Sequence, residues 1–343
     1  LVTLALTGCQ SQDEADVDAT AADAAVIVAQ PETATLVVYT SRQPHLVDPL
    51  FDQFTAQTGI EIERINDSEA ALIERLAAEG QNTPADVFMT VDAGNLWLAD
   101  ERGLLQAIDS ELLNDRIPAA YRDPAGHWFG LSTRARTILY HPDRVDTAEL
   151  STYAKLADPM WQGRLCVRTS RKVYNQSLTA MMIERLGEAQ VEAIVSGWVA
   201  NLATEPFSSD TRLIEAIAAG QCDVGIVNTY YLGRLVNEQA DYPVQLFWAN
   251  QGNSGTHVNI SGAGVTAHAP NPALAQQLIE WLAGNEAQQQ IAAGNFEFPV
   301  VEGVALDPIV AAWGEFEADS LNVAIAGQRQ AEAVMLMDRA GWR

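Results

Sequence analysis

Residues 36–90 decide the fold, and their sequence is LVVYTSRQPHLVDPLFDQFTAQTGIEIERINDSEAALIERLAAEGQNTPADVFMT. Three short runs in this stretch have the composition or the alternation of β-strands: Leu36–Tyr39, Ile60–Ile65 and Ala85–Thr90. Between them apolar residues recur at helical spacing, and Gly59 and Gly80 end the two predicted helices. The order strand, helix, strand, helix, strand predicts a parallel α/β layer with right-handed crossovers.

A second α/β unit is predicted further along the chain. Strand-like runs at Gly126–Leu131 and Thr137–Tyr140 lead toward it. Within it, a helix over Thr211–Ala219 precedes the strand-like run Cys222–Val227. The glycine-rich segment 252–265 leads into another strand and is expected to cross back between the units. We therefore expect two α/β lobes.

Composition narrows the class of protein. The chain has 343 residues, which is enough for two domains with a sizeable core. Hydrophobic residues make up 48% and charged residues 19%, as in globular proteins. The formal net charge is −25, from 45 acidic and 20 basic residues. Because binding to phosphates needs a basic patch, nucleic acid is not an expected partner.

The first residues predict export. Residues 1–9 are apolar and end in small residues and a cysteine, like the remnant of a signal peptide. Leu6-Thr7-Gly8-Cys9 resembles the bacterial lipoprotein box, in which Cys9 would be lipid-modified; a truncated transmembrane end or a chance match are the alternatives. Residues 10–35 hold six acidic residues and no lysine or arginine, so an acidic flexible tether is expected. The expected location is the periplasm or the cell surface, with a lipid anchor.

Two more cysteines, Cys166 and Cys222, each lie at the start of a strand-like run. In exported proteins an even pair of cysteines favours a disulfide, and we expect a bridge between neighbouring strands. Two free buried thiols are the alternative. A metal site is disfavoured, because no histidine or cysteine stands at finger-like spacing.

Two adjacent tyrosines, Tyr230 and Tyr231, follow the run Cys222–Val227 after two further residues. Ligands of open α/β sheets collect at the carboxyl ends of strands. A phenol that loses its proton offers an oxygen to a hard cation. A tyrosine pair can equally pack in a core with its hydroxyls on polar partners. The residues alone leave both interpretations open.

No sequence motif predicts catalysis. The patterns Gly-x-Ser-x-Gly, His-Glu-x-x-His and the phosphate-binding Walker loop are absent. The five histidines stand near no nucleophile in a recognisable pattern. We therefore expect a binding protein and not an enzyme.

Four motifs carry a family resemblance, and they occur in this order: Tyr39-Thr40-Ser41-Arg42-Gln43-Pro44-His45, Thr83-Pro84-Ala85-Asp86-Val87-Phe88, Asn228-Thr229-Tyr230-Tyr231-Leu232-Gly233-Arg234 and Gly255-Thr256-His257-Val258-Asn259-Ile260-Ser261-Gly262. Together they resemble the ferric-iron-binding proteins of bacterial ABC importers, from about residue 36 to the C-terminus. The resemblance implies a bilobal, type II-like periplasmic-binding fold, with two α/β lobes joined by hinge strands. We expect lobe 1 at residues 36–132 and 263–305, and lobe 2 at residues 133–262 and 306–343.

The resemblance also implies a ligand set for Fe³⁺. It assigns the metal to Tyr230, Tyr231 and a third tyrosine from an earlier loop, which here matches Tyr174. Some family members add a histidine, or a histidine and a tyrosine, from the first loop, but the matching positions here are Gln43 and Pro44. His45 lies close by and is a candidate ligand, with a solvated histidine as the alternative.

Residue chemistry agrees with this assignment. Fe³⁺ is a hard cation that prefers oxygen donors, and three phenolates would balance its charge. The family fills the remaining coordination positions with an anion such as carbonate, or with water. A guanidinium can hold a planar oxyanion at two points, so we expect Arg42, and secondly Arg134, to bind that anion. Ordinary surface arginines are the alternative, and Arg136 competes with Arg134 for the role.

The expected function is that of a monomeric solute-binding subunit of an ABC importer. It would capture Fe(III) in a cleft between the lobes and deliver it to a membrane permease powered by a separate ATPase. The alternatives are a binding protein for another small solute, such as a sulfonate, a polyamine or a chelated metal, or an exported enzyme on a similar fold.

Overall fold

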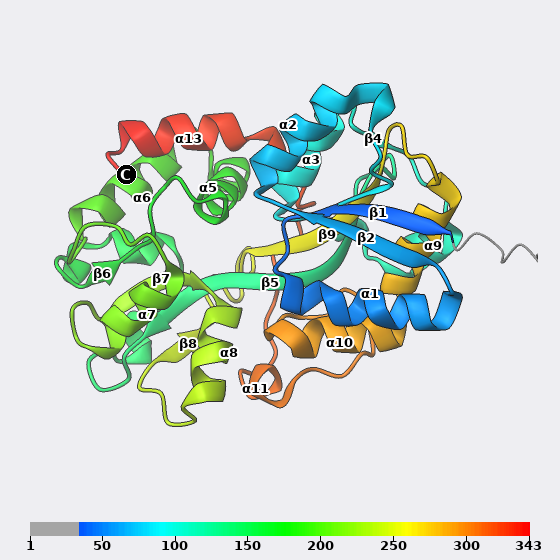
Figure 1. Ribbon diagram of the computed structural model, residues 1–343. Helices are drawn as coiled ribbons and strands as arrows, with labels where there is room; N and C mark the ends of the chain where they lie inside the picture. The colour runs from blue at the N-terminus through cyan, green and yellow to red at the C-terminus, as the bar shows by residue number, and fades with distance from the viewer. Residues whose placement is uncertain (1–33) are drawn as a thin grey trace, which may run out of the picture. The chain divides into compact units, whose positions relative to one another are not determined.

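The computed structural model describes residues 34–343 (Figure 1). The predicted lipoprotein box with Cys9, and nearly all of the predicted tether, lie outside the described residues. In the part of the chain that is described, no helix is both long and apolar enough to cross a membrane.

The predicted opening of the fold is confirmed. β1 (Thr35–Thr40) pairs in parallel with β2 (Glu61–Asn66) and with β3 (Val87–Val91). Two helices connect these strands: α1 (Pro44–Thr58) and α2 (Glu69–Glu79). Gly59 ends α1 with a φ of 74°, a left-handed conformation that glycine adopts without strain. Each strand therefore delivers the loop that follows it to the same edge of the sheet.

One long strand, β5 (Phe129–Tyr140), runs through both halves of the sheet. Its residues up to Ala135 pair with β9 (Val258–Thr266) in the first half. From Arg136 onward it pairs with β7 (Val224–Asn228) and β8 (Gln245–Phe247) in the second half. The main path of the sheet is therefore β2-β1-β3-β9-β5-β7-β6.

The prediction of two separate strands, at Gly126–Leu131 and Thr137–Tyr140, was wrong. The residues between them include Arg134 and Arg136, and their polarity hid the strand from the hydrophobic pattern. All twelve residues of β5 are buried. Polar side chains are tolerated there because they hydrogen-bond to one another and to the backbone.

The second half of the sheet carries four longer helices: α5 (Val173–Leu186), α6 (Glu188–Ala200), α7 (Asp210–Ala218) and α8 (Thr229–Glu238). The C-terminal helix α13 (Gln330–Arg339) packs on α5 and α6, as the red helix in Figure 1 shows. The remaining elements are α3 (Ala93–Glu101), β4 (Leu105–Gln106), α4 (Glu111–Arg116), β6 (Leu165–Cys166), α9 (Pro272–Leu282), α10 (Asn285–Asn295), α11 (Pro308–Ala311) and α12 (Ile325–Gln328).

The predicted disulfide is confirmed. Cys166 at the end of β6 is bonded to Cys222, two residues before β7, with their Cα atoms 5.9 Å apart. β6 and β7 are parallel neighbours in the sheet, as expected. The bond therefore fastens the start of the strand that leads to Tyr230.

Candidate metal centre

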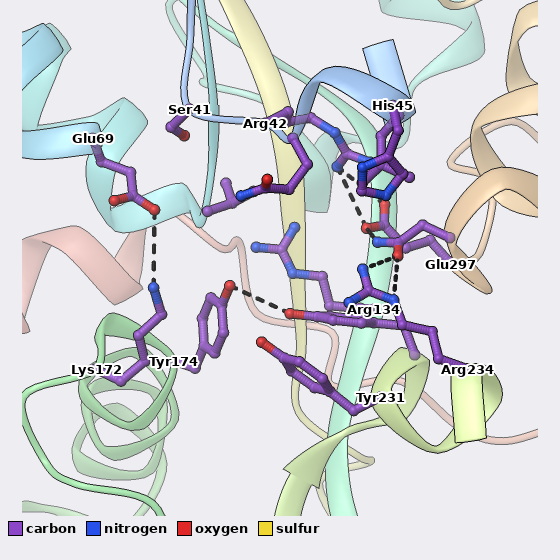
Figure 2. Close-up of a pocket in the computed structure, with 15 residues that line it drawn as sticks. Ser41, Arg42, His45, Glu69, Arg134, Lys172, Tyr174, Tyr231, Arg234 and Glu297 are labelled. Carbon is purple, nitrogen blue, oxygen red and sulfur yellow. Dashed lines mark hydrogen bonds and ion pairs between the residues drawn. The ribbon is translucent and has the colours of Figure 1, made fainter. Parts of the chain in front are cut away.

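A cavity of about 420 Å³ lies between the two halves of the sheet. Its lining includes all six residues predicted for the metal and anion sites: Arg42, His45, Arg134, Tyr174, Tyr230 and Tyr231. Figure 2 shows Tyr174 and Tyr231 on one side of the cavity, with Ser41 and Arg42 facing them from the other. Residues that are far apart in the sequence thus meet at one place.

The three tyrosines come from the first turns of two helices. Tyr174 is the second residue of α5, and Tyr230 and Tyr231 are the second and third residues of α8. β7 runs directly into α8, so the pair lies at the carboxyl end of a strand, where ligands of α/β sheets gather. The hydroxyl of Tyr230 donates a hydrogen bond to the hydroxyl of Tyr174 at 3.3 Å. The rings of Tyr230 and Tyr231 lie 4.3 Å apart, centre to centre.

Cationic side chains surround the phenols. Lys172 Nζ lies 4.6 Å from the ring centre of Tyr174. The guanidinium of Arg234 lies 5.2 Å from the ring centre of Tyr230 and 5.6 Å from that of Tyr231. The amino-terminal ends of α5 and α8 add partial positive charge. This local charge is opposite in sign to the net charge of the chain, and it favours bound anions and phenolates.

A network of buried ion pairs contacts the hydroxyl of Tyr231. Asp210 accepts from both Arg136, at 3.0 Å, and Arg168. Arg168 Nη1 lies 3.5 Å from the hydroxyl oxygen of Tyr231. The guanidinium of Arg136 also bonds to Asn175, Asn228 and the carbonyl of Ile226. Arg136 is therefore engaged away from the cavity, and of the two competing arginines it is Arg134 that lines the cavity.

Without metal, the buried phenols of Tyr174 and Tyr230 hold their protons. Burial raises the pKa of Tyr174, and the neighbouring hydroxyl of Tyr231 adds to the effect. Burial also raises the pKa of Tyr230 well above its ordinary value, and Tyr174 and Tyr231 add to that shift. A trivalent cation among the three oxygens would favour the charged forms instead, so binding would release protons.

Arg42 and Arg134 meet at one hydroxyl. Ser261 Oγ accepts from Arg42, and it accepts from Arg134 Nη1 at 2.8 Å. Arg42 is also ion-paired with Glu297, at 3.2 Å. Burial opposes the charged form of Glu297, yet its pKa lies below the ordinary value, because Arg42 and Arg134 stabilise the carboxylate. Arg134 Nη2 is buried and has no hydrogen-bond partner among residues 34–343. The free donor therefore belongs to Arg134, while Arg42 already has an acidic partner.

The structure adds cavity residues that the sequence did not single out: Glu69, Lys172, Arg234 and Glu297. Arg234 could have been found, because it follows Tyr230 and Tyr231 by four and three residues and so shares their helix face. Lys172 Nζ lies 3.9 Å from Glu69, an ion pair between the two halves of the sheet. His45, in the first turn of α1, and Gln43 before it are exposed and line the cavity.

The chain is similar to known solute-binding and iron-uptake proteins. A family model described as bacterial extracellular solute-binding protein matches residues 49–318. Iron uptake protein A1 of Synechocystis sp. is 41% identical over 94% of this chain and 91% of its own length. Iron uptake protein A2 of the same organism is 44% identical over 92% of both chains. The Trichodesmium protein IdiA (FutA), solved in complex with iron and citrate, has a TM-score of 0.87 and 45% identity, over 90% of this chain and 100% of that chain.

The fold and its cleft define a class, the bilobal type II-like periplasmic binding proteins, in which two α/β lobes flank a solute site. The chain belongs to the family of bacterial extracellular solute-binding proteins.

Proposed function

We propose that the protein captures Fe³⁺ in the cavity through the phenolates of Tyr174, Tyr230 and Tyr231. The observation that carries this proposal is the meeting of three phenols in one cavity lined by Arg42, Arg134, Lys172 and Arg234. Oxygen donors suit a hard trivalent cation, and three phenolates neutralise it. The names of the relatives, which refer to iron uptake, support the same solute.

The remaining coordination positions go to an anion or to water. The unpartnered Nη2 of Arg134 is a donor for such an anion. A cavity of about 420 Å³ has room for more than a carbonate. The Trichodesmium protein was solved in complex with iron and citrate, so a polycarboxylate is the second candidate anion after carbonate. The same four cationic side chains disfavour a polyamine as the solute.

We extend the proposal to the cellular role, which family membership and the predicted lipoprotein box support. The protein is the binding subunit of an ABC importer, and it passes its ion to a membrane permease that a separate ATPase powers. It acts as a monomer in the periplasm or at the cell surface, tethered by lipid at Cys9. It binds and releases its solute without catalysing a reaction.

The test is the colour of the iron-loaded protein. Phenolate ligands give ferric iron a visible charge-transfer absorption, so metal-free protein given Fe³⁺ and citrate or carbonate should turn orange-red. Substitution of Tyr174, Tyr230 or Tyr231 by Phe should weaken iron binding and shift this band. Tyr242→Phe is the matched control, because Tyr242 is outside the cavity lining. A protein that binds no iron, or three cavity variants that behave like the control, would refute the proposal.

A further inference from the structure

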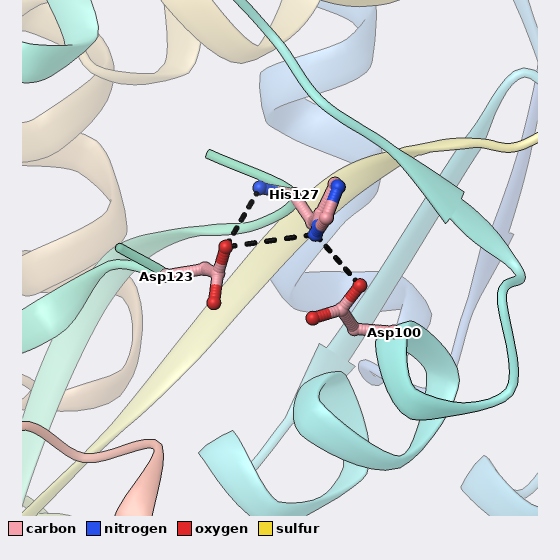
Figure 3. Close-up of side chains that lie close together, drawn as sticks. All are labelled: Asp100, Asp123 and His127. Atoms are coloured by element: carbon pink, nitrogen blue, oxygen red, sulfur yellow. Dashed lines mark hydrogen bonds and ion pairs between the residues drawn. The ribbon is translucent and has the colours of Figure 1, made fainter. Parts of the chain in front are cut away.

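A second cluster of metal-ligating side chains lies outside the iron cavity. Asp100, Asp123 and His127 place one ligand atom each within 4.8 Å of one another (Figure 3). His127 Nδ1 is 2.7 Å from Asp100 Oδ1 and 3.6 Å from Asp123 Oδ2. Asp100 is in the last turn of α3, and none of the three lines the cavity that holds the tyrosines.

The loop before β5 fixes the positions of two of these ligands, Asp123 and His127. Asp123 Oδ2 accepts hydrogen bonds from the backbone N–H of Ala125, at 2.8 Å, and of His127, at 3.2 Å. Gly126, with a φ of 81°, makes the tight turn that brings His127 back beside Asp123. Asp123 is only 8% exposed, so its carboxylate is fixed in place by the fold.

The nitrogen at the centre of the cluster is shielded from solvent and lies close to both carboxylates. His127 Nδ1 is buried and makes no hydrogen bond of acceptable geometry within residues 34–343, although Asp100 lies close to it. Two carboxylates face each other across this nitrogen, and Glu101 adds a third negative charge nearby. A bound cation would satisfy the nitrogen and relieve the repulsion.

We infer that Asp100, Asp123 and His127 form a second metal site, for a divalent first-row transition ion such as Zn²⁺. One imidazole nitrogen with two carboxylate oxygens suits Zn²⁺, whereas Ca²⁺ and Mg²⁺ prefer oxygen ligands alone. Tetrahedral ligands of Zn²⁺ lie about 3.3 Å apart. His127 and Asp100 therefore separate slightly on binding, and His127 and Asp123 move slightly closer. Water fills the open position.

The experiment uses the variant Tyr174→Phe/Tyr230→Phe/Tyr231→Phe, so that Zn²⁺ cannot bind the cavity phenols. Calorimetric titration of the metal-free protein with Zn²⁺ should show one equivalent bound, and Co²⁺ should give a visible d–d absorption. Adding His127→Ala or Asp100→Asn should weaken binding by at least about tenfold, since even the loss of an outer partner of a ligand costs that much. His268→Ala and Asp109→Asn, at exposed positions, are the matched controls.

The alternative is that His127 and Asp100 form an ordinary ion pair and bind no metal. In that case Zn²⁺ would not raise the Tm of the Tyr174→Phe/Tyr230→Phe/Tyr231→Phe variant, and the titration would show no binding. Zn²⁺ binding that is equal in the cluster variants and in the controls would also overturn the inference. If His127→Ala fails to fold, Asp100→Asn, which keeps the side-chain shape, decides the question. Iron binding by the wild-type protein is independent of every one of these outcomes.

Discussion

Arg134 combines burial with an unmet hydrogen-bonding group, since its Nη2 has no partner in the described chain and its Nη1 is held by Ser261. A donor of this kind stabilises an anion beside a metal without changing the metal's own ligands.

The first prediction therefore concerns Arg134→Gln. We expect iron affinity to fall by about tenfold or more, the loss of one charge-assisted hydrogen bond. The charge-transfer band should persist, because the phenolates remain. The anion requirement should weaken too, which iron titrations with and without citrate or carbonate would detect. Arg212→Gln, at an exposed position, is the control, and equal affinity in both variants would count against this role.

His257 lies in the sequence motif Gly255–Gly262, and it lines a different cavity from the one that holds the three tyrosines. Burial lowers the pKa of His257 to about 4, with Arg136 and Arg134 acting in the same direction and Asp319 opposing them. The unfolded chain binds a proton near pH 6.5, and the folded chain does so only near pH 4. This histidine therefore supports stability above pH 6.5, and that support is lost as the pH falls toward 4.

The second prediction is that His257→Gln makes stability less sensitive to acid. Between pH 7 and pH 5 the wild type should lose roughly 2 kcal/mol more unfolding free energy than the variant does. Urea unfolding at both pH values measures the difference. His268→Gln serves as the exposed control, and parallel losses in wild type and His257→Gln would contradict the prediction.

Cavity residues could be predicted from the sequence where they lie in a recognisable motif. Tyr230 and Tyr231 are adjacent in the chain, and the resemblance pointed to Tyr174. Glu297 could not be predicted, because its pairing with Arg42 joins residues 255 positions apart. No local pattern reports such a contact. The assignment of the tyrosines as iron ligands stays a prediction until a metal is bound.

At the scale of elements, the disulfide joins β6 to the segment that begins β7. It closes a loop of 56 residues that contains α5, α6 and α7. A cross-link over a loop of this length stabilises a protein mainly by restricting its unfolded chain.

The third prediction is that Cys166→Ala/Cys222→Ala lowers the free energy of unfolding by roughly 4 kcal/mol. Iron affinity of the folded variant should change little, because neither cysteine lines the cavity. Denaturant unfolding of the variant, compared with wild type under oxidising and reducing conditions, measures the effect. A variant as stable as the oxidised wild type would show that the disulfide does not stabilise the fold.

The strands were predictable to different degrees for a physical reason. The first three have an apolar run or a clear alternation, so their hydrophobic pattern was sufficient. β5 was missed as one strand because its middle is polar and yet buried, a combination that only tertiary partners make stable. The lobe boundaries at residues 132/133, 262/263 and 305/306 stay predictions, since β5 takes part in both halves of the sheet.

At the scale of the whole binding unit, the proposed ligands are unevenly divided. Tyr174, Tyr230 and Tyr231 all come from α5 and α8, whereas the opposite wall offers Ser41, Arg42 and Glu69. Iron could then attach to the second lobe first, and closure would follow by motion about the hinge. Lys172 and Glu69 form an ion pair across the cleft at 3.9 Å.

The fourth prediction is that Glu69→Gln speeds the release of iron to a competing chelator without altering the absorption band. The pair is partly exposed, so its loss should change the rate by no more than about fivefold. Stopped-flow absorption measures this rate. Glu74→Gln is the matched control, because Glu74 pairs with Arg102 at the surface of the first lobe. Equal rates of iron release in the two variants would show that the Lys172–Glu69 ion pair does not contribute to closure.

The continuous strand β5 also limits how the gene can be divided. Its first seven residues complete one half of the sheet and its last five complete the other. A break in the coding sequence at the midpoint of β5 would leave each product with a truncated strand and unpaired backbone groups. Because β9 returns late in the chain to pair with β3, the first product would lack a strand of its own half of the sheet, and the second product would carry that strand without its partner. The first half of the sheet is therefore encoded by two separated stretches of the gene, and a single cut within β5 does not yield two self-contained lobes.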